Sequence, residues 1–210
     1  MRKYIKLNAI PIIIEIIFII SYFIIPKNYF IYTNFLFYLS LLIYFVIKKD
    51  FSIREWINNI KSGKKFWKQV IITLILFIAA FALTIILENA FSDFNTGMIG
   101  LKQDSWLKLT IFAISTILFP AVTEEIFYRK NMISFNNKGI LAVTTLISMF
   151  LYALEHSLTI WGILLTMIWA LPLSVSYIKT KNIFVPMTAH FIDNLLGNGI
   201  DVVMTFISLI

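Results

Sequence analysis

The stretch "LTIFAISTILFPAVTEEIFYRK", residues 109–130, decides how the rest of the chain is interpreted. Residues 109–122 are apolar apart from small hydroxyl side chains, and two adjacent glutamates, Glu124 and Glu125, then precede an arginine, Arg129. A charged side chain at the depth of a bilayer costs at least about 2.5 kcal/mol, so such residues tend to face the interior of a helix bundle and to mark function. The stretch therefore predicts a membrane helix that carries a functional site.

The composition indicates that lipid surrounds much of the 210-residue chain. Hydrophobic residues make up 60%, the mean hydropathy is +0.86, and only 14% of residues are charged, against roughly 25% in soluble domains. A soluble domain of this size could not bury so much apolar surface in one core. Cysteine is absent, which excludes disulfides, thiol chemistry and cysteine-bound zinc.

We expect an all-α, polytopic membrane protein with about eight transmembrane helices, since a crossing takes about 20 mainly apolar residues. The candidate spans are residues 8–25, 29–47, 67–88, 106–128, 139–157, 159–178, 183–197 and 199–210. The last two are short and separated by "GNG", so a kinked or re-entrant pair is an alternative. A polar stretch near 51–62 predicts an interfacial amphipathic helix. Without long linkers or repeats, residues 1–210 should form one membrane domain.

The basic residues predict the orientation of the chain. The net charge is +7, and the positive side chains cluster between apolar spans, which favours anionic lipid headgroups over nucleic acid as their partner. Arg2, Lys3 and Lys6 precede a first span without a small-x-small cleavage site, so we expect a retained helix and a cytoplasmic N-terminus. A seven-span version fits the same charges up to the last segment. The Ile-, Lys- and Asn-rich composition predicts a bacterial plasma membrane.

Three clusters of polar residues interrupt the apolar spans and include both histidines of the chain. They are Glu124, Glu125 and Arg129; Glu155 and His156; and His190, Asp193 and Asn194. Structural roles are open for each: Glu125 and Arg129 at i, i+4 would form an ion pair, and His190 with Asn194 a packing pair between helices. Glu124 points about 100° away from Glu125 on an α-helix and needs a separate partner.

The functional interpretation joins these clusters in one buried, wet pocket. Glu124 would act as a base and polarise a water together with His156, while His190 and Asn194 would donate hydrogen bonds to the oxyanion of a tetrahedral intermediate. A metal is the competing use, because Glu124, His156 and His190 form a known kind of catalytic zinc set. The HExxH signature of many zinc proteases is absent.

The three clusters, in this order, resemble the motifs of the CPBP family of intramembrane endopeptidases. That family includes type II CAAX prenyl proteases and bacteriocin-processing or immunity proteins. Its EExxxR motif is matched by residues 124–129, its FxxxH motif by residues 152–156 with Tyr152 in place of Phe, and its HxxxN motif by residues 190–194. The resemblance covers residues 105–198, which would be the catalytic core, while residues 1–104 carry no recognised motif.

The resemblance implies catalytic roles for Glu124, His156, His190 and Asn194, with Glu125, Arg129 and Tyr152 in support. The family has been described both as metalloproteases and as glutamate-dependent proteases, so no cofactor is certain and zinc is possible. Two features depart from the pattern: Tyr152 adds a hydroxyl, and Glu155 puts a second carboxylate beside His156.

The sequence thus predicts an endopeptidase that hydrolyses a peptide bond of a membrane-associated peptide or protein precursor. Its partners would be that substrate and the lipid bilayer, without nucleic acid, and its oligomeric state is open. The main alternative is a non-enzymatic immunity or partner-binding protein on the same fold. A small ion-coupled transporter is a third possibility, disfavoured because the two halves show no inverted repeat or paired broken helices.

Overall fold

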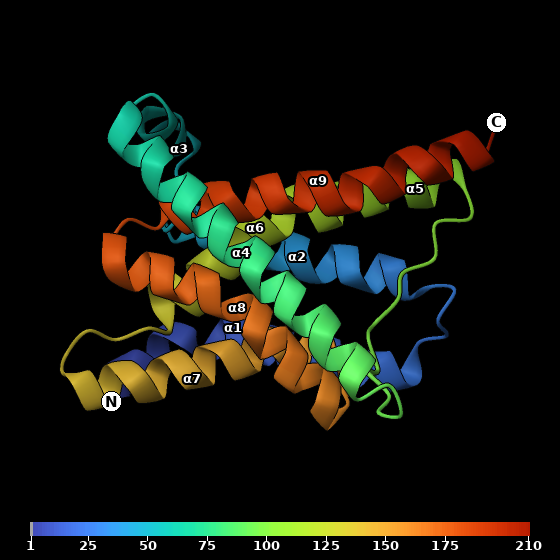
Figure 1. The fold of residues 1–210 in the computed structure, drawn as a ribbon, viewed down its shortest axis with the longest axis horizontal. Helices are drawn as coiled ribbons and strands as arrows, with labels where there is room; N and C mark the ends of the chain where they lie inside the picture. Colours follow the sequence, from blue (N-terminus) through green and yellow to red (C-terminus); the bar gives the residue numbers. More distant parts are fainter. Residues whose placement is uncertain (1) are drawn as a thin grey trace. The chain divides into compact units, whose positions relative to one another are not determined.

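The computed structural model describes residues 2–210, with side chains from Asn8 onward (Figure 1). The side chains of Arg2, Lys3 and Lys6, which carry part of the predicted orientation, lie outside the described residues. Within the described part the chain is helical and has no strand, only an isolated bridge between Met98 and Ser157. The all-α prediction is confirmed.

The helices follow the predicted apolar segments closely, with one exception at the C-terminal end. In chain order they are α1 (Arg2–Ile24), α2 (Phe30–Ile47), α3 (Ile53–Ile60), α4 (Lys64–Ala90), α5 (Trp106–Ala113), η1 (Ile114–Leu118), α6 (Phe119–Glu124), η2 (Glu125–Asn131), α7 (Lys138–Leu154), α8 (Ile160–Thr180) and α9 (Phe184–Ser208). The prediction of separate spans over 183–197 and 199–210 is wrong, because α9 continues through both glycines of "GNG". A helical glycine costs only about 1 kcal/mol, less than the contacts of α9 described below can supply.

Four helical segments of the described chain are long and apolar enough to cross a membrane. They are Phe30–Ile47, Lys64–Ala90, Trp106–Asn131 and Ile160–Thr180, and the shorter Asn8–Ile24 and Lys138–Leu154 are also apolar. These helices indicate a membrane protein, but the predicted number of about eight spans is not confirmed. The short α3 falls inside the predicted amphipathic stretch; its placement at the bilayer interface stays a prediction.

The chain divides into two compact units. The first unit contains Met1–Ser52, Gly100–Ile126 and His190–Ile210, and the second contains Ile53–Ile99 and Phe127–Ala189. Each unit is therefore built from segments that are far apart in the sequence. The predicted boundary between residues 1–104 and a catalytic core stays a prediction.

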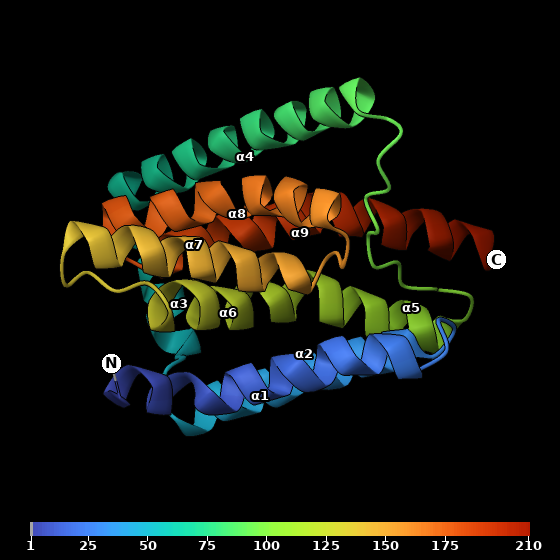
Figure 2. The same cartoon turned by 90° about the horizontal axis from the view of Figure 1, so that it is seen from below.

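In the first unit, aromatic side chains join α1 to α2, which lie side by side (Figure 2). The rings of Phe18 and Phe37 stack with centroids 4.4 Å apart, and Phe18 also lies 5.3 Å from Phe30. On another face of α2, Phe35 contacts Phe119 of α6 at 5.8 Å. Through this contact, α2 packs against the segment that ends in Glu124.

The C-terminal part of α9 runs antiparallel to the segment that leads to Glu124, also in the first unit. Asn198 Nδ2 donates to the Thr116 carbonyl at 2.9 Å, and Phe206 contacts Trp106 with ring centroids 5.3 Å apart. Thr116 lies in the π-helical segment η1, between α5 and α6. The side chain of Asn198 thus binds a backbone carbonyl where the regular α-helix is interrupted in an apolar segment.

In the second unit, α8 packs against both α4 and α7. Hydroxyl and indole groups join α4 to α8 at two levels: Thr73 Oγ1 donates to Ser176 Oγ at 2.8 Å, and Trp169 Nε1 donates to Thr84 Oγ1 at 3.0 Å. Hydrogen bonds of this kind hold helices together in apolar surroundings.

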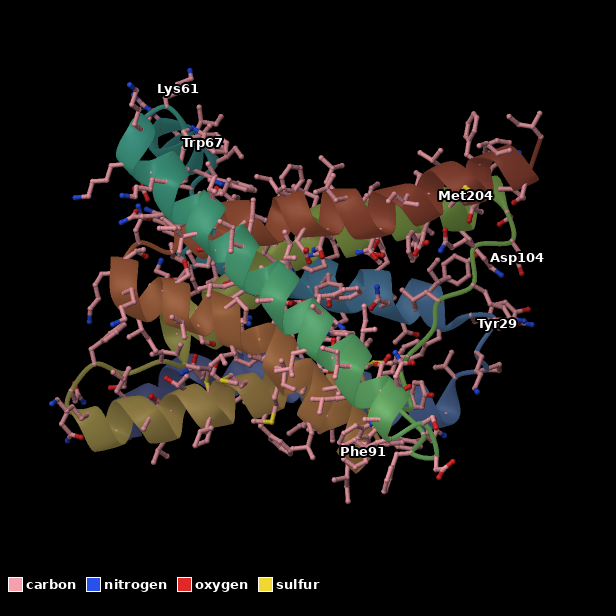
Figure 3. The ribbon with its side chains drawn as sticks, in the orientation of Figure 1. Tyr29, Lys61, Trp67, Phe91, Asp104 and Met204 are labelled. Carbon is pink, nitrogen blue, oxygen red and sulfur yellow. The ribbon has the colours of Figure 1, made fainter. Side chains whose placement is uncertain are left out.

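Indole groups also fix the helix that precedes α4. Trp56 of α3 is buried and donates to Thr188 Oγ1 at 2.8 Å. The Nε1 of Trp67, labelled near the start of α4 in Figure 3, donates to the Ile60 carbonyl at 3.0 Å. The turn between α3 and α4, which includes Lys61, is therefore closed by a hydrogen bond.

Candidate active site

Glu124, the last residue of α6, is fully buried and receives a hydrogen bond from Tyr38 of α2. The Tyr38 Oη to Glu124 Oε1 distance is 2.6 Å, which is typical of a hydroxyl that donates to a charged carboxylate. The other oxygen, Oε2, is buried and makes no hydrogen bond within the described residues. One oxygen of Glu124 is thus held by a fixed donor, and the other is available as an acceptor.

His190 of α9 lies between the two adjacent glutamates. Its Nδ1 is 2.9 Å from Glu125 Oε1, and its Nε2 is 3.8 Å from Glu124 Oε2. Both carboxylates and most of the imidazole are buried. The sequence predicted that neighbouring glutamates would point to different faces and have separate partners. Glu124 does have a partner of its own in Tyr38, yet both carboxylates also reach one imidazole.

The contact with Glu125 relates the tautomer of His190 to the charge of this carboxylate. An ionised carboxylate only accepts hydrogen bonds, so with Glu125 ionised Nδ1 is the donor to Glu125 Oε1. Nε2 then has two possible states. In the neutral ring it is an acceptor or a metal ligand, and in the imidazolium it is a second donor, aimed toward Glu124.

Asn194 lies one helical turn after His190 on α9 and in the same unit. Its Nδ2 is buried and makes no hydrogen bond within the described residues, so the amide has an unused donor. Asp193, the neighbouring acidic residue, is exposed. Within the described residues, the first unit therefore places a carboxylate oxygen without a hydrogen bond near an imidazole, and it holds an amide donor one helical turn after that imidazole.

His156 belongs to the second unit and lies beyond the end of a helix. The predicted span 139–157 placed it within a helix, but α7 ends at Leu154 and His156 is in the following turn. The ring of Tyr152, on the last turn of α7, lies 4.7 Å from the imidazole of His156. The position of His156 is thus set by a turn and an aromatic neighbour.

Tyr152 also contacts Arg129 of η2, the arginine of the first motif. The Arg129 guanidinium lies 4.6 Å from the centre of the Tyr152 ring, within the range of a cation–π interaction. Arg129 Nη2 donates to the Ala170 carbonyl at 3.4 Å. An aromatic ring at position 152 therefore links the arginine of one motif to the histidine of another inside the second unit.

A second tyrosine binds the additional carboxylate of this region. Tyr128 Oη donates to Glu155 Oε1, and the Tyr128 carbonyl accepts from Ser148 Oγ at 2.5 Å. Both tyrosine and glutamate are buried. Glu155 therefore has a fixed hydrogen-bond partner within the second unit.

The segment from Glu125 to Asn131 is a π-helix, which the sequence did not predict. A π-helix bonds residues five apart instead of four, so the i, i+4 spacing of Glu125 and Arg129 does not by itself place them on one face. Their ion pair stays a prediction, as does the meeting of Glu124 with His156. The structure brings together Glu124, Glu125 and His190 in one unit, and Arg129, Tyr152 and His156 in the other.

Glu124 and His190 lie close enough to each other to bind one metal ion together. Carboxylate and imidazole ligands lie about 2.0–2.2 Å from zinc, so a separation of 3.8 Å between Oε2 and Nε2 permits one ion to bind both. Glu125 on Nδ1 would be the outer carboxylate that commonly orients a metal-binding histidine. The third predicted ligand, His156, lies in the other unit.

These residues fall inside a segment that also matches a known family. Residues 106–196 match the family model described as type II CAAX prenyl endopeptidase, Rce1-like. The match confirms the resemblance that the three motifs predicted, and it supports a peptidase of the CAAX type. A search of curated proteins and a search of solved structures each returned no significant match.

All seven predicted site residues lie inside the Rce1-like segment, whereas Tyr38 lies outside it. Sequence reasoning missed Tyr38 because α2 contains several aromatic residues and no motif. A tyrosine hydroxyl in an apolar span needs a partner, and that requirement was the available signal. It could not identify Glu124 as the acceptor.

Proposed function

We propose that this protein is an intramembrane endopeptidase in which Glu124 activates water. The observation that carries the proposal is the state of the Glu124 carboxylate: one oxygen is fixed by Tyr38, and the other is buried, makes no hydrogen bond and lies 3.8 Å from His190. A carboxylate in this condition is suited to take a proton from a water molecule. The Rce1-like match over residues 106–196 supports peptide hydrolysis as the reaction.

In the proposed reaction, Glu124 accepts a proton as the water oxygen bonds to the carbonyl carbon of the substrate. His156 orients the same water, as the family resemblance implies. The proton then passes to the leaving nitrogen as the carbon–nitrogen bond breaks. This sequence consumes one water and yields a carboxylate and an amine.

Asn194 is the proposed donor to the oxyanion of the tetrahedral intermediate, since its buried Nδ2 makes no hydrogen bond. His190 adds a second donor when Nε2 is protonated, with Glu125 on Nδ1 to hold the ring. Removing one such donor typically lowers kcat by about 100- to 1000-fold.

A bound zinc ion is the competing version of the same site, held by Glu124, His156 and His190. Zinc would polarise the substrate carbonyl and acidify a bound water. In that version Glu125 orients a neutral His190, and Asn194 keeps its role as a donor. The two versions differ in their response to a chelator.

The proposed substrate is a membrane-associated peptide or a protein precursor, cleaved near the cytoplasmic side of a bacterial plasma membrane. The apolar helices support the membrane location, while orientation and source rest on charge pattern and composition. Lys61, Lys64, Lys65 and Lys68 cluster at the start of α4, which supports a cytoplasmic position for that end.

The test is cleavage of a fluorogenic peptide library by the purified protein in lipid nanodiscs. Wild type, Glu124→Gln, Asn194→Leu and the control Asp193→Asn would be compared with and without a chelator. We expect activity in wild type and Asp193→Asn and its loss in the other two variants. Full activity of Glu124→Gln would refute the proposal. Inhibition by chelator, reversed by zinc, would select the metal version.

A further inference from the structure

A segment from the N-terminal half of the chain lies across the turn that carries His156. This segment, residues 95–99, is here called the strap. The Ile99 amide donates to the His156 carbonyl at 2.8 Å, and Met98 forms an antiparallel bridge with Ser157. His156 is therefore held through its own backbone by residues that lie outside the Rce1-like segment.

Two hydroxyl side chains also bind the backbone of the strap, at Asn95 and Thr96. Ser157 Oγ donates to the Thr96 carbonyl at 2.7 Å. Thr159 Oγ1 lies 2.9 Å from the Asn95 carbonyl and 2.8 Å from the Thr96 carbonyl. Ser157 is fully buried. A buried hydroxyl with backbone acceptors is costly to remove, because the acceptors lose their partner.

Two glycines permit the close approach of the strap to α8. A Cβ on Gly162 would lie 1.8 Å from the Thr96 carbonyl oxygen and 2.1 Å from Ser157 Oγ. A Cβ on Gly97 would lie 2.3 Å from Thr159 Cγ2, and Gly97 also has φ +55°, a left-handed conformation. The Thr96 carbonyl and the Ser157 side chain thus fill the space that a side chain at Gly162 would need, and the Thr159 side chain fills the space beside Gly97.

Aromatic side chains anchor the chain just before the strap. Phe91, labelled at the end of α4 in Figure 3, contacts Trp161 at 5.4 Å, and Phe94 contacts the same indole at 5.8 Å. The strap is therefore fixed to the start of α8 before it reaches the turn. These contacts give the segment a fixed path without regular secondary structure.

We propose that the strap positions His156, with Ser157, Thr159 and Gly162 as positioning residues. The inference rests on the proposed role of His156 in orienting water. The physical reason is that α7 ends at Leu154, so the carbonyl of His156 lies beyond the helix, while its amide still donates to the Ala153 carbonyl at 3.1 Å. The strap supplies a donor for the His156 carbonyl through the Ile99 amide. A displacement of about 1 Å at a reacting group can lower the rate roughly 100-fold.

The experiment follows His156 directly and does not depend on cleavage. The chain has two histidines, so side-chain NMR of histidine-labelled protein gives one set of imidazole signals for each, assigned with His156→Gln and His190→Gln. The test variants are Ser157→Ala, Thr159→Val and Gly162→Ala. Their matched controls are Thr145→Val, whose hydroxyl bonds the Leu141 carbonyl of its own helix, and Gly100→Ala, where a Cβ meets nothing within 4 Å.

We expect each test variant to shift or broaden the His156 signal and leave the His190 signal unchanged. The kcat for peptide cleavage should fall about 10- to 100-fold with KM unchanged, and Thr159→Ser, which keeps the hydroxyl, should retain wild-type kcat. Gly162→Ala is the variant at greatest risk of misfolding, and Ser157→Ala tests the proposal without adding an atom.

Each outcome decides the proposal. Unchanged His156 signals in both Ser157→Ala and Thr159→Val would overturn it, as would changes of both histidine signals together with a loss of helicity. If wild type cleaves no peptide, the proposed function fails, while the His156 signal still reports whether the strap positions this residue.

Discussion

The hydroxyl of Tyr38 lies 2.6 Å from Glu124 Oε1, although the two residues are 86 positions apart in the sequence. A helix without any recognised motif therefore sets the orientation of the carboxylate to which the first motif points. The two oxygens of Glu124 therefore differ: Oε1 accepts the hydrogen bond from Tyr38, and Oε2 makes no hydrogen bond in the described residues.

Replacing Tyr38 by Phe should lower kcat by about 10- to 100-fold with little change in KM. The loss of a hydrogen bond to a buried charged acceptor costs about 1–3 kcal/mol, and each 1.4 kcal/mol in the barrier is about tenfold in rate. Peptide cleavage kinetics would measure the effect. Tyr32→Phe, on the same helix, is the control and should behave as wild type; equal activities of the two variants would contradict the role of Tyr38.

Replacing Glu125 by Gln should reduce activity by roughly 10- to 100-fold, the usual effect of removing a carboxylate that orients a functional histidine. The glutamine keeps an oxygen near Nδ1 but loses the charge that now lies 2.9 Å from it. Kinetics measures the loss, with the exposed Asp193→Asn as control. In the zinc version the same variant should also bind zinc more weakly in competition with a chelator, whereas unaltered kcat and zinc affinity would show that Glu125 is dispensable.

Replacing Asn198 by Ala should destabilise the protein by about 1–2 kcal/mol, because the Thr116 carbonyl loses a donor in apolar surroundings. Unfolding in detergent measures the difference from wild type, and unchanged stability of Asn198→Ala would contradict the role of this hydrogen bond.

The length of α4 predicts that the residues before it and the residues after it lie on opposite sides of the membrane. Its 27 residues extend about 40 Å, more than the roughly 30 Å of hydrocarbon in a bilayer. The chain has no cysteine, so Lys61→Cys and Asp93→Cys each introduce one thiol. An impermeant thiol reagent added to intact cells should label Asp93→Cys only. Labelling of Lys61→Cys from outside would reverse the proposed orientation.

The Asp104–Lys108 ion pair should give a small stability change with pH at the start of α5. The hydrogen bond from Lys108, at 2.6 Å, lowers the pKa of Asp104 from 3.8. Because the folded-state pKa is the lower one, the stabilisation is present above the unfolded-state value and is lost as pH falls through the folded-state value. The Tm difference between wild type and Asp104→Asn should therefore shrink below about pH 4 and at high salt.

The sequence predicted the helical content and the three polar clusters because both depend on local pattern. Runs of apolar residues read as helices, and a buried Glu or His in such a run stands out whatever its partner. It did not predict that α9 would cross "GNG", because the hydrogen bond from Asn198 and the contact of Phe206 are tertiary. The π-helical segments η1 and η2 were not predicted either.

The partners of the site residues were harder to predict than the residues themselves. Tyr38 lies on an aromatic-rich helix where its hydroxyl carries no periodic signal, and the strap over His156 is a short irregular segment. The predicted helix through 139–157 failed at its last residues because Glu155 and His156 take part in contacts with Tyr128 and Ile99. Local propensity decides where elements lie, and long-range hydrogen bonds decide where they end.

The contact between Glu125 and His190 also has a consequence during biosynthesis. The two residues are 65 positions apart, so the ribosome must add that length of chain before the imidazole exists. Until then the segment carries two neighbouring carboxylates without the imidazole that contacts both of them in the folded chain. The proposed active site can therefore form only after α9 has been synthesised.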